Sequence, residues 1–275
     1  MNKILNTKIV YFGLVAIYCL ILINFKSYSN VVDNSNPNIA TFSEAELNNH
    51  SLLTRAHSNR YPEYQKKAYN DFLEKISKNE DFSNIEASCI YFNKVNRNLI
   101  IGHSGAVFLG AIMGREEMLQ YGFDVVSFGG LFDEDICMTF DKLNKKYDNI
   151  VLYGFTNDLN LRASAGLNEL DRSYCETFYN LINKAREHLN DLNGKLILMR
   201  VKNMTLEVDH NDPDYIENYN TMAHTLNNIM DELGYITYEI PFDTSKEHTS
   251  HYIHYDKKYV YEKMLTDLNY ILYKK

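Results

Sequence analysis

From about residue 86 onward, short apolar runs alternate with longer amphipathic segments, and this alternation restricts the possible folds more than any other feature. The apolar runs predict five strands: Asn98–Gly102, Phe123–Phe128, Asn149–Gly154, Lys195–Val201 and Tyr235–Pro241. The segments between and after them predict helices near residues 105–121, 133–147, 171–193, 213–233 and 256–273. Alternation of this kind produces a parallel sheet with helices on both faces. The sequence therefore predicts a flavodoxin-like three-layer α/β/α domain with a five-stranded parallel sheet.

Local signals agree with these helix limits. Asp171 and the pair Asp212-Pro213 suit helix starts, because Asp accepts hydrogen bonds from free N–H groups and Pro fits the first turn. Gly194 and Gly234 follow the apolar periodicity and indicate where two helices end.

The N-terminal segment Ile9–Phe25 holds 17 residues without a charge and lies between Lys8 and Lys26. At about 1.5 Å per residue, a helix of this length reaches about 25 Å, the short end of a membrane span. Lys3 and Lys8 precede it, which favours a cytoplasmic N-terminus. We expect residues 1–26 to form one N-terminal transmembrane helix that anchors the protein, with a cleaved secretory signal or a buried helix as alternatives. Both the anchor and the signal place residues 27–275 on the extracytoplasmic side of the cell membrane.

Residues 27–60 are rich in Asn and Ser and have no sustained apolar period, so we expect an extracytoplasmic linker there. The folded domain is expected over residues 61–275. It would begin with a helix from Pro62 to about Asn79, because apolar residues recur there at three- and four-residue spacing.

Charge and cysteine content exclude several classes of protein. The net charge of −8 argues against a nucleic-acid binder, because phosphate backbones are bound by an excess of Lys and Arg. Four cysteines without CxxC spacing exclude a dense disulfide scaffold and a zinc finger. No G-x-G-x-x-G follows a strand and no P-loop lysine is present, so no nucleotide cofactor is expected.

Polar and glycine-rich loops follow the predicted strands. They read Gly102-His103-Ser104-Gly105 after the first strand, Ser127-Phe128-Gly129-Gly130 after the second, Gly154-Phe155-Thr156-Asn157-Asp158 after the third, and His251-Tyr252-Ile253-His254-Tyr255 before the last helix. In doubly wound sheets, ligands bind beyond the carboxyl ends of the strands. These loops are therefore expected to meet at one edge of the sheet.

The residue types in these loops suit acyl transfer. Ser104 would begin a helix directly after a strand, where free N–H groups and the positive helix end stabilise an oxyanion. A histidine such as His254 can take the proton of a serine hydroxyl. The amide of Asn157 can donate to an oxyanion. Each residue also has a simpler interpretation: Ser104 as a helix cap, Asn157 as an Asx turn, and His254 as a surface side chain.

In the order and position of these blocks, residues 97–270 resemble the SGNH (GDSL-like) hydrolase family. The segment Gly154–Asp158 supplies the G-x-N-D block, and His254-Tyr255 the final block. The resemblance implies that Ser104 is the nucleophile and His254 the base. It also implies an oxyanion hole formed by the N–H of Ser104, by Gly129 or Gly130, and by Asn157.

Two positions depart from the family pattern. The first block has His103 where the family has Asp, and His251 stands three residues before His254, where the family has the Asp that orients the base. Asp243 or Glu247 could replace that carboxylate, the enzyme could use a Ser–His dyad, or the protein could be a non-catalytic pseudo-enzyme. The histidines His248, His251 and His254, with His103, also allow a metal hydrolase, although a three-residue period would not keep them on one helix face.

The sequence thus predicts a membrane-tethered extracytoplasmic serine esterase or acyltransferase. Its expected substrates are acylated small molecules or cell-surface glycans, O-acetyl groups in particular. No cofactor or metal is expected, and no nucleic-acid partner.

Overall fold

The structure is a computed structural model that describes residues 63–84, 88–191, 193–205, 213–245, 247–251 and 254–274. The elements are α3 (Glu63–Lys78), β1 (Phe82–Asn84), β2 (Ser88–Tyr91), β3 (Asn98–Gly102), α4 (Ser104–Gln120), β4 (Phe123–Phe128), α5 (Asp133–Lys142), β5 (Asn149–Tyr153), α6 (Thr156–Ser164), α7 (Arg172–Glu187), β6 (Lys195–Met199), α8 (Pro213–Glu232), β7 (Ile236–Tyr238), β8 (Thr249–His251), β9 (His254–Tyr255) and α9 (Lys258–Tyr273).

The main sheet has the strand order β1-β2-β4-β3-β5-β6-β7. The strands from β3 to β7 pair in parallel, whereas β1 and β2 are antiparallel additions at one edge. Within the five parallel strands, chain order and spatial order are related as in flavodoxin, with β3 in the position where the winding direction reverses. The predicted architecture is confirmed in its parallel part.

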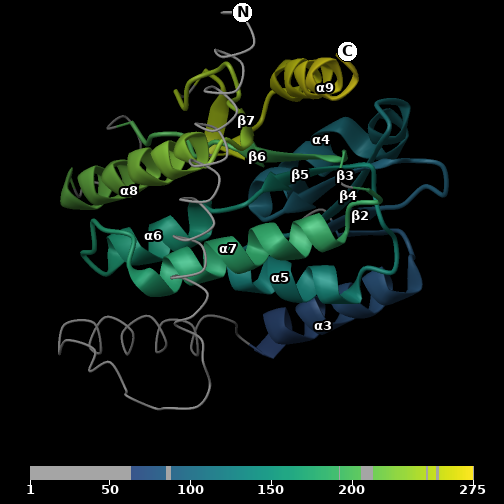
Figure 1. Ribbon diagram of the computed structural model, residues 1–275, viewed down its shortest axis with the longest axis horizontal. Coiled ribbons are helices and arrows are strands. Elements are labelled where there is room, and N and C mark those ends of the chain that lie inside the picture. Colours follow the sequence, from purple (N-terminus) through teal and green to yellow (C-terminus); the bar gives the residue numbers. More distant parts are fainter. Residues whose placement is uncertain are drawn as a thin grey trace, which may run out of the picture. The chain divides into compact units, whose positions relative to one another are not determined.

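Helices cover both faces of the sheet, as predicted (Figure 1). Successive residues of a strand point to opposite faces, so Leu99 and Ile101 of β3 pack into one core, with α3, α5, α6, α7 and α8. Ile100 between them packs into a second core, with α4 and α9. All three side chains are fully buried. Every strand of the parallel core thus needs two apolar faces, which explains the continuous apolar runs in the sequence.

Two features of the sequence prediction are wrong. The sheet in the described part of the chain has seven strands rather than five, because β1 and β2 are only three and four residues long and offer little periodic signal. A helix, α6, begins at Thr156, where the sequence predicts a loop to Asp158. The small hairpin of β8 and β9 also lies outside the prediction.

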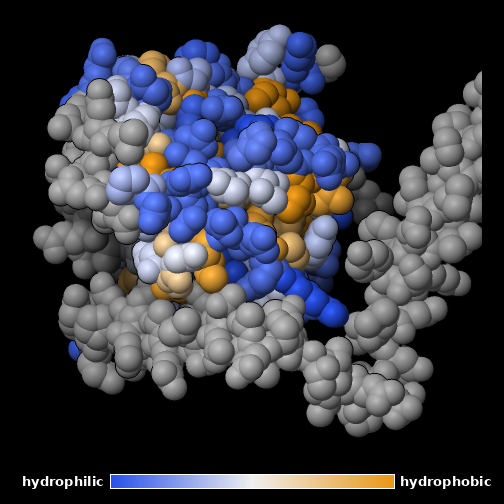
Figure 2. Space-filling model, turned by 90° about the vertical axis from the view of Figure 1, so that its left-hand side faces the viewer, coloured by the Kyte–Doolittle hydropathy of each residue, from blue (hydrophilic) through white to orange (hydrophobic). Residues whose placement is uncertain are grey.

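The face shown in Figure 2 is mostly hydrophilic among the described residues, with smaller hydrophobic areas between. In the part of the chain that the structure describes, no helix has the length and apolar character to cross a membrane. The predicted anchor at residues 1–26 and linker at 27–60 lie outside the described residues.

Candidate active site

Ser104 is the first residue of α4, directly after β3, as predicted. The turn needs glycine on both sides of His103 and Ser104. A Cβ on Gly102 would lie 2.0 Å from the carbonyl oxygen of Tyr153, and one on Gly105 would lie 2.8 Å from the Tyr153 ring. The close approach of β3 to β5 therefore fixes the start of α4. The N–H of Ser104 lies in the first helical turn, where backbone donors have no acceptor within the helix.

His254 lies beside Ser104, although 150 residues separate them in the chain. The hairpin of β8 and β9 carries the histidine, and its Nε2 lies 2.7 Å from Oγ of Ser104. This distance is within the range for proton transfer between a nucleophile and its base. The structure thus brings together the two residues that the sequence predicts as nucleophile and base.

Phe108 contacts the other side of the histidine. Its ring stacks on the imidazole of His254 with a centroid distance of 4.6 Å and an angle of 10° between the planes. The loop motifs in the sequence do not include this residue. The signal was its spacing, because residues four apart lie on the same face of a helix, and Phe108 follows Ser104 by four.

His103 caps α4. Its Nδ1 accepts a hydrogen bond from the N–H of Gly105 at 3.3 Å, so the ring proton resides on Nε2. The side chain is 2% exposed, and Nε2 has no hydrogen-bond partner among the described residues. Burial lowers the pKa of His103 from 6.5 to about 4, opposed by the Gly154 backbone and supported by nearby His254. His103 is therefore neutral at physiological pH.

Asn157 lies in the first turn of α6 and is nearly buried. Its Nδ2 donates to the carbonyl oxygen of Leu131 at 2.8 Å, which leaves the second amide hydrogen for another acceptor. Leu131 follows Gly129 and Gly130 in the loop after β4, so this bond joins the two loops that carry the predicted oxyanion donors. Gly130 has a φ of +82°, a left-handed conformation that favours glycine.

Asp133 also connects the loop after β4 with the loop after β5. It starts α5, is fully buried, and its Oδ1 accepts from the N–H of Phe155 at 3.0 Å. Its own N–H donates to Oδ2 of Asp158 at 3.0 Å. Burial, and next the carboxylate of Asp158, raise the pKa of Asp133 well above its usual value. Nothing in the sequence pattern distinguished this residue from an ordinary acidic helix start.

Comparison with known proteins identifies the fold. No protein-family model matches the sequence, and no curated protein matches it. A solved GDSL-like lipase from Bacteroides thetaiotaomicron VPI-5482 covers 75% of this chain and 98% of its own, with a TM-score of 0.53 and 11% sequence identity. A protein from Streptococcus pneumonia described as a platelet activating factor covers 80% of this chain and 99% of its own, with a TM-score of 0.50 and 14% identity. The domain has the SGNH hydrolase fold.

The SGNH resemblance predicted from the loop blocks is therefore confirmed for the fold. One block needs a correction in its spacing. Phe155 and Thr156 both stand between Gly154 and Asn157, so the position two residues before Asn157, which is Gly in G-x-N-D, is occupied by Phe155. Phe155 has a φ of +77°, a conformation that is costly for an aromatic residue. Its hydrogen bond to Asp133 and its buried ring hold it there.

The histidines near the C-terminal end of the chain lie in and beside the β8–β9 hairpin. The backbone of His251 pairs with that of His254 across the hairpin. Oδ1 of Asp243, one of the two carboxylates considered as orienting groups, lies 3.6 Å from Nε2 of His248, whose Nδ1 lies 2.7 Å from the hydroxyl of Tyr259. Glu247, the other, is exposed. Within the described residues, no group of three or more His, Cys, Asp or Glu side chains could hold a metal ion.

Proposed function

We propose that the protein is a membrane-tethered extracytoplasmic serine esterase or acyltransferase. The observation that carries this proposal is the 2.7 Å contact between Oγ of Ser104 and Nε2 of His254 at the carboxyl edge of an SGNH sheet. A serine hydroxyl is a weak nucleophile unless a neighbouring base takes its proton, and this geometry supplies the base.

The reaction would proceed in two steps. Oγ of Ser104 attacks the carbonyl carbon of an ester while its proton passes to Nε2 of His254. The N–H of Ser104, the N–H of Gly129 or Gly130, and Nδ2 of Asn157 stabilise the tetrahedral oxyanion. His254 then gives the proton to the departing alcohol oxygen, which leaves an acyl-serine. A water molecule or an acceptor hydroxyl, deprotonated by His254, attacks this ester and releases Ser104.

Acyl groups on cell-surface glycans, O-acetyl groups in particular, are the proposed substrates. The apolar segment between Lys8 and Lys26 supports a location outside the cytoplasm. After Lys26 the chain has 25 basic and 36 acidic residues, a net charge of −11. Anionic lipid headgroups repel such a surface, which favours a substrate in the cell envelope over the membrane lipids themselves.

A fluorophosphonate probe tests this proposal, because it labels a serine only when a neighbouring base activates it. The full chain, solubilised in detergent, should react with the probe and hydrolyse a small activated acetyl ester. Ser104→Ala should abolish both activities. Labelling or hydrolysis that persists unchanged in Ser104→Ala would show that Ser104 is not the nucleophile.

A non-catalytic SGNH-like surface protein is the second candidate. It is favoured by His251, which stands where the family has the orienting Asp. Loss of that Asp costs about 10⁴ in rate in well-studied triads. A correctly folded wild-type chain without probe labelling or ester hydrolysis would support this alternative. Loss of hydrolysis on chelation, with recovery on adding zinc, would instead support the metal hydrolase.

A further inference from the structure

The nucleophile and the ring that contacts its base come from one helix. Ser104 and Phe108 lie one turn apart on α4, and His254 from the distant hairpin contacts both. Nε2 of the imidazole lies 2.7 Å from Oγ of Ser104, while the flat side of the ring lies on Phe108 at 4.6 Å. The position of Ser104 and the plane of the imidazole are therefore set by the same rigid element.

Parallel stacking at an angle of 10° restricts the imidazole in the direction that matters for catalysis. Rotation of the ring about its Cβ–Cγ bond would swing Nε2 away from Ser104, and it would also break the contact of the two faces. Aromatic pairs in an offset stack at centroid distances of about 4.5–7 Å are favourable beyond the area they bury.

Protonation strengthens this contact. The face of an aromatic ring carries partial negative charge and attracts a cation within about 6 Å of its centroid. When His254 takes the proton of Ser104 it becomes such a cation, directly over Phe108. An orienting carboxylate has two effects on a catalytic histidine: it fixes the ring and it stabilises the imidazolium. Phe108 can supply a weaker form of both.

Several titratable groups lie near His254 in the described part of the chain. His103, on the turn before α4, has a pKa that nearby His254 helps to lower, and it is neutral at physiological pH because it is buried. On the hairpin, His251 pairs with His254 through the backbone, and Asp256 just beyond is paired with Lys257 at 3.1 Å. The partial negative charge on the ring face of Phe108 acts on His254 in addition to these groups.

We propose that Phe108 is a positioning residue for His254, which holds the imidazole toward Ser104 and stabilises its protonated form in the transition state. The inference rests on the proposed function, since it assigns one contact that orients the base of that reaction.

Phe108→Leu tests the proposal, because it keeps an apolar side chain of similar length and removes the ring. Hydrolysis of the activated ester should fall about tenfold in kcat with little change in KM. Loss of the stabilising ring should also shift the titration of His254, followed by NMR of its ring protons, to lower pH by about half a unit. Phe108→Tyr keeps the ring and should retain kcat within about twofold.

Ile112→Val is the matched control. Ile112 lies one turn further along α4 and packs on the same core. It reports any general effect of a small apolar truncation, and it should leave both kcat and the His254 titration unchanged. A Phe108→Leu chain with an unchanged titration and an unchanged kcat would overturn the proposal, as would equal losses in Phe108→Leu and Phe108→Tyr. The NMR titration does not require turnover, so a shift without any esterase activity in wild type would count against the proposed function alone.

Discussion

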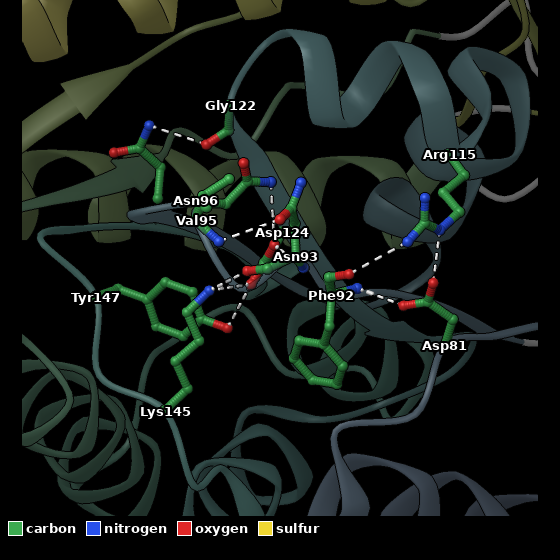
Figure 3. A network of polar contacts seen from close by, with 11 residues as sticks. Asp81, Phe92, Asn93, Val95, Asn96, Arg115, Gly122, Asp124, Lys145 and Tyr147 are labelled. Carbon is green, nitrogen blue, oxygen red and sulfur yellow. Dashed lines mark hydrogen bonds and ion pairs between the residues drawn. The ribbon is translucent and has the colours of Figure 1, made fainter.

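The amino ends and the carboxyl ends of the parallel strands form two edges of the central sheet, and the buried carboxylates at these edges differ in how many hydrogen bonds they accept. At the amino edge, Asp124 near the start of β4 is fully buried, and its two oxygens accept four hydrogen bonds (Figure 3). The donors are the N–H of Asn93 at 2.9 Å, Nδ2 of Asn96 at 3.1 Å, Nζ of Lys145 at 2.8 Å and the hydroxyl of Tyr147 at 3.0 Å. Each oxygen of this carboxylate accepts two hydrogen bonds. Asp124 thereby connects β4 with residues 93–96 and 145–147.

At the carboxyl edge, Asp133 is buried to the same degree but is less well satisfied. Its Oδ1 accepts from Phe155, and its Oδ2 has no partner with hydrogen-bond geometry among the described residues. Within the described part of the chain, Nε2 of His103 also lacks a partner with hydrogen-bond geometry at this edge, although the Gly154 backbone acts to raise its pKa. After burial, the strongest influence on the pKa of Asp133 is a second carboxylate, Asp158, which raises it; Arg162 lowers it by a smaller amount.

The difference separates a network that serves stability from the one around the proposed site. Buried polar groups are normally paired, because an unpaired group costs about 1–3 kcal/mol. The network around Asp124 follows this rule and serves stability. The carboxyl edge departs from it around the loops that present Ser104 and Asn157, which is where local rules are expected to yield to function.

The largest effect should follow from breaking the amino edge. Asp124→Ala leaves the ammonium of Lys145 and three other donors without their acceptor. We expect the free energy of unfolding to fall by about 3 kcal/mol, toward the lower end for a broken buried pair because Lys145 is partly exposed. Urea unfolding of wild type and variant measures this.

The control for this prediction is the reactivity of Ser104. Because Asp124 lies at the edge opposite to the site, the fraction of Asp124→Ala that is folded should react with the fluorophosphonate probe at the rate of wild type. A slower rate in the folded fraction would show that the two edges are linked, and the contrast between them would fail.

A smaller effect, with a distinct pH dependence, is expected at Asp133. Because its pKa is raised in the folded protein, the folded state holds a proton that the unfolded state releases above about pH 4. Stability from this group is therefore present at low pH and is lost as pH rises, by at most about 1.4 kcal/mol per pH unit. Tyr174 and Arg162 act to lower the pKa of Asp133, but burial and Asp158 outweigh them. Asp133→Asn mimics the protonated form of the side chain and should therefore lack this loss of stability.

Unfolding of wild type and Asp133→Asn between pH 4 and pH 8 measures the difference. The variant should gain stability relative to wild type as pH rises. A difference that stays constant with pH would mean that Asp133 is ionised in the folded protein over this whole range.

The sequence predicts much of the fold because parallel strands buried on both faces leave strong signals. The five strands from β3 to β7 and the helices α4, α7, α8 and α9 begin within two residues of their predicted starts. The strands β1 and β2 escape prediction because they are short and take their position from pairing along β4, a tertiary contact without a local pattern. The start of α6 escapes because Phe155 adopts a positive φ that its residue type does not suggest.

The candidate site divides in a similar way. The positions of Ser104 and Asn157 after strands of the sheet could be predicted from the pattern of the sequence, and the contact of His254 with Ser104 from the resemblance to the SGNH family. Phe108 and Asp133 could not, since their importance depends on what they contact: a histidine 146 residues later, and the N–H of a strained residue on another loop. Such contacts exist only after the chain has folded.

The smallest effect at neutral pH is expected for His103→Asn. Asn is a good helix cap and can accept from the N–H of Gly105 as Nδ1 of His103 does, so stability at pH 7 should change by less than about 1 kcal/mol. The folded protein lowers the pKa of His103 to about 4, so between that value and 6.5 the unfolded state binds a proton that the folded state refuses. Wild type therefore loses stability as pH falls through this range, opposite in sign to the loss at Asp133, and His103→Asn should not. Unfolding measured from pH 7 to pH 4 should show the variant gaining on wild type; parallel curves would mean that Nε2 of His103 has a partner that accepts its proton, and the carboxyl edge would then be as well satisfied as the amino edge.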